Sequence, residues 1–151
     1  MDFPYKKAIV TGGAGFIGSH IVERLVKMGV ETISFGDGVC EMALDLAEFH
    51  MSSADRAHGG VLFSMLDTAM GRAVITKLPP GRGCATIEAK INFFRPVQNG
   101  RIVARGTAVR MTRRTCYAEG VLIDGDGNEL ARSTATFMLT ETMKQSERER
   151  V

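Results

Sequence analysis

Residues 58–71 of this chain read His58-Gly59-Gly60-Val61-Leu62-Phe63-Ser64-Met65-Leu66-Asp67-Thr68-Ala69-Met70-Gly71. From Val61 to Ile75 apolar side chains occupy nearly every side of a helix, which predicts a helix buried at the centre of the fold. Asp67 stands in the middle of this apolar segment, and burying a carboxylate without a partner is costly. Its position therefore indicates either a functional carboxylate or a hydrogen bond to a neighbouring loop.

Small and polar residues share one stripe of the predicted helix, at spacings of three or four: Gly60, Ser64, Asp67 and Gly71. We expect this stripe to clear space beside the carboxylate. Gly59 and Gly60 fall at the helix start, where backbone N–H groups have no intrahelical partner and glycine lets a ligand approach them. For the preceding His58, a structural role in fixing the loop is favoured over a catalytic one.

The helix start and the carboxylate are too far apart to act together within one helix. His58 and Asp67 are nine residues apart in sequence, which is about 13 Å along a helix. Two antiparallel helices from two subunits could bring the glycine end of one beside the carboxylate of the other, under two-fold symmetry. The sequence thus favours a homodimer.

The rest of the chain predicts strands. Apolar and polar residues alternate from Thr86 to Phe93, and further strands are predicted at 101–111, 115–123 and 130–139. Upstream, residues 30–46 are typical of a strand interrupted by a turn at Gly36-Asp37-Gly38, and residues 47–57 of a polar loop. Because short turns pair consecutive strands antiparallel, we expect an α+β fold in which one antiparallel sheet wraps around one long central helix.

Length and composition limit the class of protein. A chain of 151 residues is typical of one domain, and its net charge of +2 gives no indication of nucleic-acid or membrane binding. Three cysteines, Cys40, Cys84 and Cys116, show no close pairing and predict reduced thiols in the cytoplasm. The segment 124–128 begins like a calcium loop but lacks the required glycine, so we interpret it as a hairpin turn and expect neither a metal site nor a cofactor.

Two motifs carry a family resemblance: the segment 58–71 quoted above, and Ala85-Thr86-Ile87-Glu88-Ala89-Lys90-Ile91-Asn92-Phe93-Phe94-Arg95-Pro96 followed by Gly100. Together they closely resemble the hotdog-fold acyl-CoA thioesterases of the phenylacetate-pathway (PaaI-like) type. The resemblance covers residues 30–140, and it includes both motifs and the spacing between them.

This resemblance implies a hotdog homodimer, or a dimer of dimers, that hydrolyses acyl-CoA thioesters at the subunit interface. Asp67 would be the nucleophile or general base, and the Gly59 N–H, with Gly60 as a second donor, would bind the oxyanion from the facing subunit. Thr86 occupies the position of a hydroxyl that orients water. Arg113 and Arg114 match a basic turn near the CoA phosphates, although a solvated turn explains this pair equally well.

One departure from the family pattern lies six residues before His58. The family usually carries Asn or Gln there, and this chain has Ser52, whose side chain is too short to make the same contact without a bridging water or Ser53. His58 and Ser52 complete the candidate site residues. The alternative that Ser52 motivates is a non-catalytic acyl-CoA binder.

The first part of the chain resembles a different family. The segment 10–20, Val-Thr-Gly-Gly-Ala-Gly-Phe-Ile-Gly-Ser-His, is similar to the opening of extended short-chain dehydrogenases of the epimerase type. The Tyr-x-x-x-Lys pair of that family is absent, so an NAD-binding module using Gly12, Gly15 and Gly18 is the less favoured alternative. We expect a leader over 1–29 whose helix packs on the body, the hotdog domain over 30–140, and a frayed charged tail over 141–151.

Overall fold

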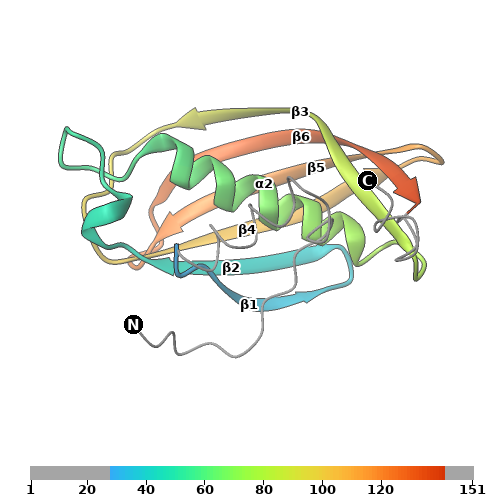
Figure 1. Ribbon diagram of the computed structural model, residues 1–151, viewed down its shortest axis with the longest axis horizontal. Coiled ribbons are helices and arrows are strands. Elements are labelled where there is room, and N and C mark those ends of the chain that lie inside the picture. Colours follow the sequence, from blue (N-terminus) through green and yellow to red (C-terminus); the bar gives the residue numbers. More distant parts are fainter. Residues whose placement is uncertain (1–27, 142–151) are drawn as a thin grey trace, which may run out of the picture.

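An antiparallel six-stranded sheet curls around the long helix α2 in the computed structural model, which describes residues 28–141 (Figure 1). Its elements are β1 (Glu31–Gly36), β2 (Val39–Asp45), the 3-10 helix η1 (Glu48–His50), α2 (Gly59–Ile75), β3 (Arg82–Phe93), β4 (Arg101–Met111), β5 (Thr115–Asp124) and β6 (Glu129–Glu141). This architecture confirms the predicted α+β hotdog fold. The predictions for the leader up to residue 27 and the tail from residue 142 lie outside the described residues.

The sheet order is β1-β2-β4-β5-β6-β3, so β1 and β3 form its two edges. Two details of the predicted topology are wrong. Residues 30–46 form two strands of a hairpin and not one interrupted strand, because Asp37 and Gly38 both adopt positive φ angles (48° and 82°) and reverse the chain. In addition, β3 does not pair with β4, its neighbour in sequence, but pairs with β6 on the far side of the sheet.

The helix lies directly on the sheet through its apolar face, which consists of Leu62, Met65, Leu66, Ala69, Met70, Ala73 and Val74. Two glycines that face each other in β4 and β5, Gly106 and Gly120, permit this close approach. A Cβ atom on Gly106 would lie 2.3 Å from the backbone carbonyl carbon of Ala69. Within residues 28–141, no helix has the length and apolar character needed to cross a membrane.

A bulge in edge strand β3 changes which of its side chains face the helix. The register with β6 shifts between Thr86 and Glu88, so that Ile87 is left unpaired and 56% exposed. Ala89 and Ile91 pack against the core, as the alternating pattern predicts. The same pattern places Thr86 on the opposite, polar face, which is wrong: the bulge reverses the alternation and turns Thr86 toward α2.

Candidate active site

Asp67 lies on the side of α2 that faces β3, and it is half-buried. The Thr86 hydroxyl donates a hydrogen bond to its carboxylate, with 2.9 Å between Thr86 Oγ1 and Asp67 Oδ1. Burial raises the pKa of Asp67 above its ordinary value, and the hydrogen bond from Thr86 partly opposes this increase. A carboxylate with a raised pKa is a stronger base than an exposed one, which suits proton abstraction near neutral pH.

The stripe of small residues around Asp67 is open at one end and packed at the other. Gly60 is exposed, and the Ser64 hydroxyl donates to the Gly60 carbonyl oxygen at 2.8 Å. Gly71, however, is buried: a Cβ there would lie 3.3 Å from the Phe137 ring and 4.0 Å from the Cys84 sulfur. The expectation that the whole stripe clears space is therefore wrong at Gly71, where a neighbouring strand fills the room.

The negative charge of Asp67 also acts on a thiol, that of Cys84 on β3. Burial, and to a smaller extent the negative charge of Asp67, raises the pKa of the Cys84 thiol to about 12. Its sulfur is directed at the Gly71 carbonyl oxygen, 3.5 Å away. The Cys84 thiol therefore stays protonated at neutral pH and is a poor nucleophile.

The N-terminus of α2 presents one backbone amide with no acceptor in the part of the chain that the structure describes. His58 is the N-cap residue, and its Nδ1 accepts a hydrogen bond from the Gly60 N–H at 3.0 Å. This contact occupies the Gly60 amide, one of the two predicted oxyanion donors. Within residues 28–141 the Gly59 N–H has no hydrogen-bond acceptor, so it is the amide available to a ligand.

Sequence reasoning missed His50, because residues 47–57 carry only the pattern of a polar loop. Its ring is 2% exposed, and its Nδ1 accepts the Ala47 N–H at 2.9 Å, so that Nε2 carries the proton and donates to the Met28 carbonyl at 2.8 Å. Its own carbonyl accepts the His58 N–H at 2.8 Å. Through these hydrogen bonds, one buried histidine connects Met28 and the segment after β2 to the N-cap of α2.

Ser52 does not point to the helix start but closes a tight turn in the loop. Its hydroxyl donates to the Arg56 carbonyl at 3.0 Å, and its N–H donates to the same oxygen at 2.8 Å. Asp55 adopts a positive φ of 51° within this turn. Ser52, which stands where the family usually has Asn or Gln, therefore holds the backbone of Arg56 in place.

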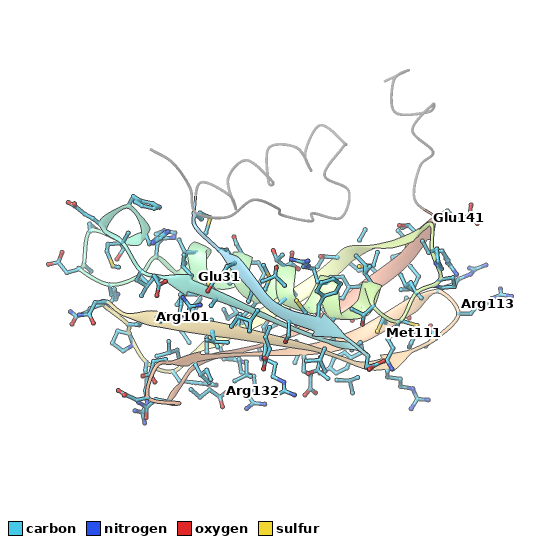
Figure 2. The ribbon with its side chains drawn as sticks, turned by 90° about the horizontal axis from the view of Figure 1, so that it is seen from below. Glu31, Arg101, Met111, Arg113, Arg132 and Glu141 are labelled. Atoms are coloured by element: carbon cyan, nitrogen blue, oxygen red, sulfur yellow. The ribbon has the colours of Figure 1, made fainter. Side chains whose placement is uncertain are left out.

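Arg113 and Arg114 are exposed in the turn between β4 and β5. Arg113 lies near Glu141, at the end of the sheet where β6 finishes (Figure 2), whereas the N-terminus of α2 lies at the opposite end (Figure 1). A single chain therefore does not bring these arginines to the Gly59 amide.

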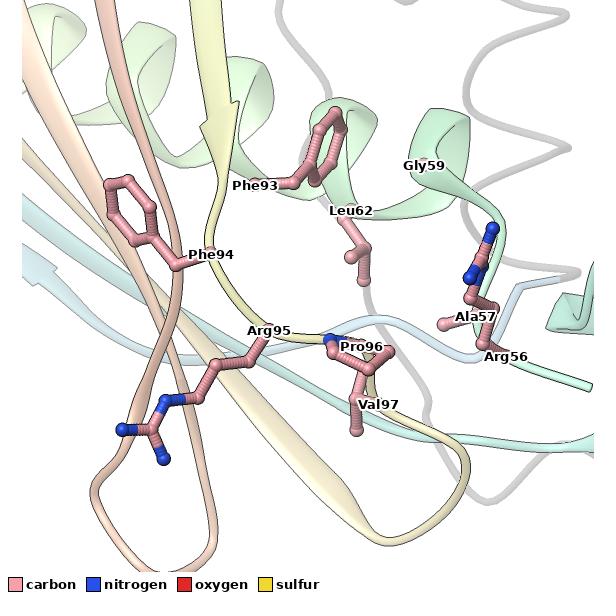
Figure 3. Close-up of a pocket in the computed structure, with 9 residues that line it drawn as sticks. All are labelled: Arg56, Ala57, Gly59, Leu62, Phe93, Phe94, Arg95, Pro96 and Val97. Carbon is pink, nitrogen blue, oxygen red and sulfur yellow. The ribbon is translucent and has the colours of Figure 1, made fainter.

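A pocket of about 350 Å³ opens beside Gly59 (Figure 3). Its wall is formed by residues from three places, namely the loop before α2, the first turn of α2, and the end of β3 with the segment that follows: Arg56, Ala57, Gly59, Leu62, Phe93, Phe94, Arg95, Pro96 and Val97. No sequence pattern predicts it, because these residues meet only when β3 crosses to the far edge of the sheet. A substrate whose carbonyl binds at Gly59 would extend into it.

Comparison with known families gives two matches. The thioesterase superfamily matches residues 55–131, which include the start of α2, Asp67, β3 and most of the following strands. The NAD-dependent epimerase/dehydratase family matches residues 8–75. The described part of that second segment contains the antiparallel β1–β2 hairpin, whereas a dinucleotide-binding unit requires parallel strands.

Solved structures with the same fold include a conserved protein from Pseudomonas aeruginosa, which is 31% identical, with a TM-score of 0.74, over 77% of this chain and 92% of that one. A phenylacetic acid degradation-related protein from Ralstonia eutropha is 28% identical, with a TM-score of 0.70, over 77% of this chain and 89% of that one. A protein from Streptococcus mutans, solved with bound acetyl-CoA, is 22% identical over 76% of this chain and 91% of that one, with a TM-score of 0.70.

Proposed function

The chain belongs to the thioesterase superfamily, and from this membership and the geometry of α2 we propose that it hydrolyses acyl-CoA thioesters in a site shared by two subunits. The observation that carries the proposal is the pair of complementary groups on one helix. A half-buried carboxylate with a raised pKa lies in its middle, and at its start lies the Gly59 amide, for which residues 28–141 offer no acceptor. The acetyl-CoA bound to the structural neighbour supports CoA thioesters as the substrate class.

In the proposed reaction, the thioester carbonyl oxygen accepts the Gly59 N–H of one subunit while Asp67 of the other subunit acts as base or nucleophile. As a base, Asp67 takes a proton from water, and the resulting hydroxide adds to the carbonyl carbon. The positive end of the α2 dipole and the Gly59 amide stabilise the oxyanion. Collapse of this intermediate breaks the carbon–sulfur bond, and the CoA thiolate leaves and takes up a proton.

The exposed edge of the sheet supports the dimer on which this reaction depends. Strand β3 is an edge strand, and large apolar side chains on it and just after it are more than half exposed, namely Ile87, Phe93 and Phe94. An unpaired edge with exposed apolar residues is a template for pairing with another chain. We propose that β3 pairs with its copy in a second subunit, which places the two α2 helices side by side and antiparallel.

Arg113 and Arg114 fit the same arrangement. Because they lie far from Gly59 within one chain, they approach a bound CoA only if the partner supplies them. We propose that this exposed basic turn contacts the CoA phosphates of a substrate held by the opposite Gly59 amide.

Replacing Thr86 by valine is expected to move the acidic limb of the pH profile to higher pH. The Thr86 hydrogen bond favours the ionised form of Asp67, so its loss raises the pKa of that carboxyl beyond the increase due to burial. The pH dependence of kcat/KM checks this result. Thr86→Ser, which keeps the hydroxyl, serves as the control and should leave the limb close to its wild-type position.

Mixing two inactive variants tests the shared site directly. Gly59→Pro removes the amide proton at the first helical position, where proline is well tolerated, and His58 already has the extended backbone (φ −66°, ψ 132°) that a following proline requires. Asp67→Asn removes the base. In a randomly mixed population half of the dimers contain both variants, and one of the two sites in each is intact, so about one quarter of wild-type activity should return.

The readout is the release of free thiol from acyl-CoA esters, measured before and after the subunits are exchanged. Activity restored to about one quarter supports a site built from two chains. If each variant alone is inactive and the mixture also remains inactive, Gly59 and Asp67 act within one chain or not at all. A wild-type protein that binds acyl-CoA without turnover would favour the non-catalytic binder instead.

A further inference from the structure

The pocket beside Gly59 has a composition that favours one kind of ligand group. Arg56 and Arg95 line it, and none of the described lining residues is acidic. The remaining lining side chains are apolar, and the positive end of the α2 dipole adds to the local potential. A negatively charged group at the end of a short apolar chain would match this wall.

The two arginines differ in direction. Figure 3 shows the Arg95 side chain pointing away from Gly59. Hydrogen bonds from Asn128 lower the pKa of Asp124 at the end of β5, and the charge of Arg95 makes a minor contribution. The Arg56 side chain instead rises beside Gly59. Among the described residues no carboxylate forms an ion pair with Arg56. Arg56 is therefore the cation that a ligand in this pocket would meet.

The loop holds Arg56 in this position. Its carbonyl accepts both the N–H and the hydroxyl of Ser52, and the adjacent Met51 and Ala57 form an antiparallel bridge across the turn. Because both ends of the turn are bonded, the backbone of Arg56 is fixed relative to the N-cap of α2. The side chain thus extends from a fixed backbone position beside the pocket, so no rearrangement of the loop is needed to bind an anion.

From this geometry we propose that Arg56 forms a subsite for an anionic group of the thioester substrate, and that this group is a carboxylate on a short acyl chain. The inference rests on the proposed thioesterase function. Arg56 and Gly59 are three residues apart, so their Cα atoms are separated by at most about 11 Å. In CoA, an extended pantetheine arm separates the sulfur from the nearest phosphate by roughly 15 Å. Because the Arg56 side chain rises beside Gly59 (Figure 3), an anion paired with it would lie nearer to a carbonyl bound at Gly59 than phosphates at the end of an extended arm.

Succinyl-CoA and butyryl-CoA test this proposal, because they have the same number of acyl carbons and differ in the terminal carboxylate. Arg56→Gln is expected to lower kcat/KM for succinyl-CoA by about tenfold, which is the usual value of a charge-assisted hydrogen bond, and to leave butyryl-CoA unchanged. Arg56→Lys should retain part of the preference. Arg105→Gln removes the same charge from an exposed position on β4 and should not change the ratio of the two substrates.

Three outcomes would overturn the acyl-carboxylate assignment. An equal loss for both CoA esters, absent with butyryl-pantetheine, would assign Arg56 to the CoA phosphates. No change with either ester would remove Arg56 from substrate recognition. A loss of the same size in Arg105→Gln would show that the effect comes from the overall charge of the protein and not from the position of Arg56.

Binding separates this inference from the proposed reaction. In an Asp67→Asn background, equilibrium titration should show that Arg56→Gln weakens succinyl-CoA binding by about tenfold and butyryl-CoA binding not at all. If the wild-type protein hydrolyses neither ester but this difference in binding persists, the thioesterase function fails and the subsite stands. If hydrolysis occurs without the difference, the subsite fails and the thioesterase function stands.

Discussion

Replacing Asp67 by asparagine is expected to lower kcat/KM for acyl-CoA hydrolysis by about 10²–10⁴-fold, the usual contribution of a positioned acid–base group. The amide keeps the shape of the carboxylate and can still accept the hydrogen bond from Thr86 Oγ1. It has no basic oxygen to take a proton from water and no charge with which to attack the thioester. Free-thiol release with a panel of acyl-CoA esters measures the loss.

The same substitution should not destabilise the fold at neutral pH. Because burial raises the pKa of Asp67, folding disfavours the ionised carboxylate. The cost is present above the raised pKa of the folded state and disappears as the pH falls below the ordinary value of an unfolded aspartate. Asparagine carries no charge at any pH, so the variant should melt at or above the wild-type temperature at pH 7 and lose this advantage in acid.

Two results would contradict this account of Asp67. Equal rates of thiol release in the wild type and in Asp67→Asn would remove the carboxylate from the reaction. A lower melting temperature of the variant at pH 7 would mean that the charge of Asp67 stabilises the fold, for example through an ion pair formed in the assembled protein, and the loss of activity would then have to be corrected for unfolding.

Replacing Gly106 by alanine is expected to have the largest effect on stability. The new methyl group would lie 2.3–2.4 Å from the backbone atoms of Ala69 and Met70, and a helix backbone cannot rotate away as a side chain can. The helix must instead lift from β4, which opens the core along its whole contact. Overpacking commonly costs 1–3 kcal/mol, and we expect about 3 kcal/mol or more here, which corresponds to a decrease of roughly 10 °C in Tm.

Gly120 on the neighbouring strand provides a matched control, because it pairs with Gly106 in the sheet and also faces α2. A Cβ on Gly120 would approach the ends of the Leu66 and Met70 side chains at 3.0–3.3 Å, and these can move. Gly120→Ala should therefore cost clearly less than Gly106→Ala in thermal or denaturant unfolding. Equal losses would show that close approach of the helix backbone is not the reason for glycine at position 106.

Local patterns were sufficient for most elements of the fold. The apolar residues around the helix predict α2 within two residues of its start, and the strands predicted at 101–111, 115–123 and 130–139 match β4, β5 and β6. The sequence pattern predicts one interrupted strand before α2, whereas the Asp37-Gly38 turn reverses the chain and produces two paired strands. Short turns could not predict the pairing of β3 with β6, because β4 and β5 lie between these two strands in the sequence.

Much of the candidate site was named from the sequence, but its geometry was not. Asp67 was found because a carboxylate in an apolar helix needs a physical reason, and the glycines at the helix start because bare amides occur there. The contact of Thr86 with Asp67 depends on a one-residue bulge at Ile87, which no alternation pattern contains. The burial of His50 and the place of Arg56 beside Gly59 likewise depend on how a polar loop folds back on itself.

The amino-acid sequence alone thus determined the central helix, its carboxylate and the strand segments. Hydrophobic periodicity and the cost of burying a charge can both be judged from residues close together in the sequence. Only the folded arrangement decided which strand lies at the edge, which hydroxyl meets the carboxylate and which amide stays without an acceptor. These features arise from contacts between segments far apart along the chain, and a single bulge or a single side-chain cap is enough to change them.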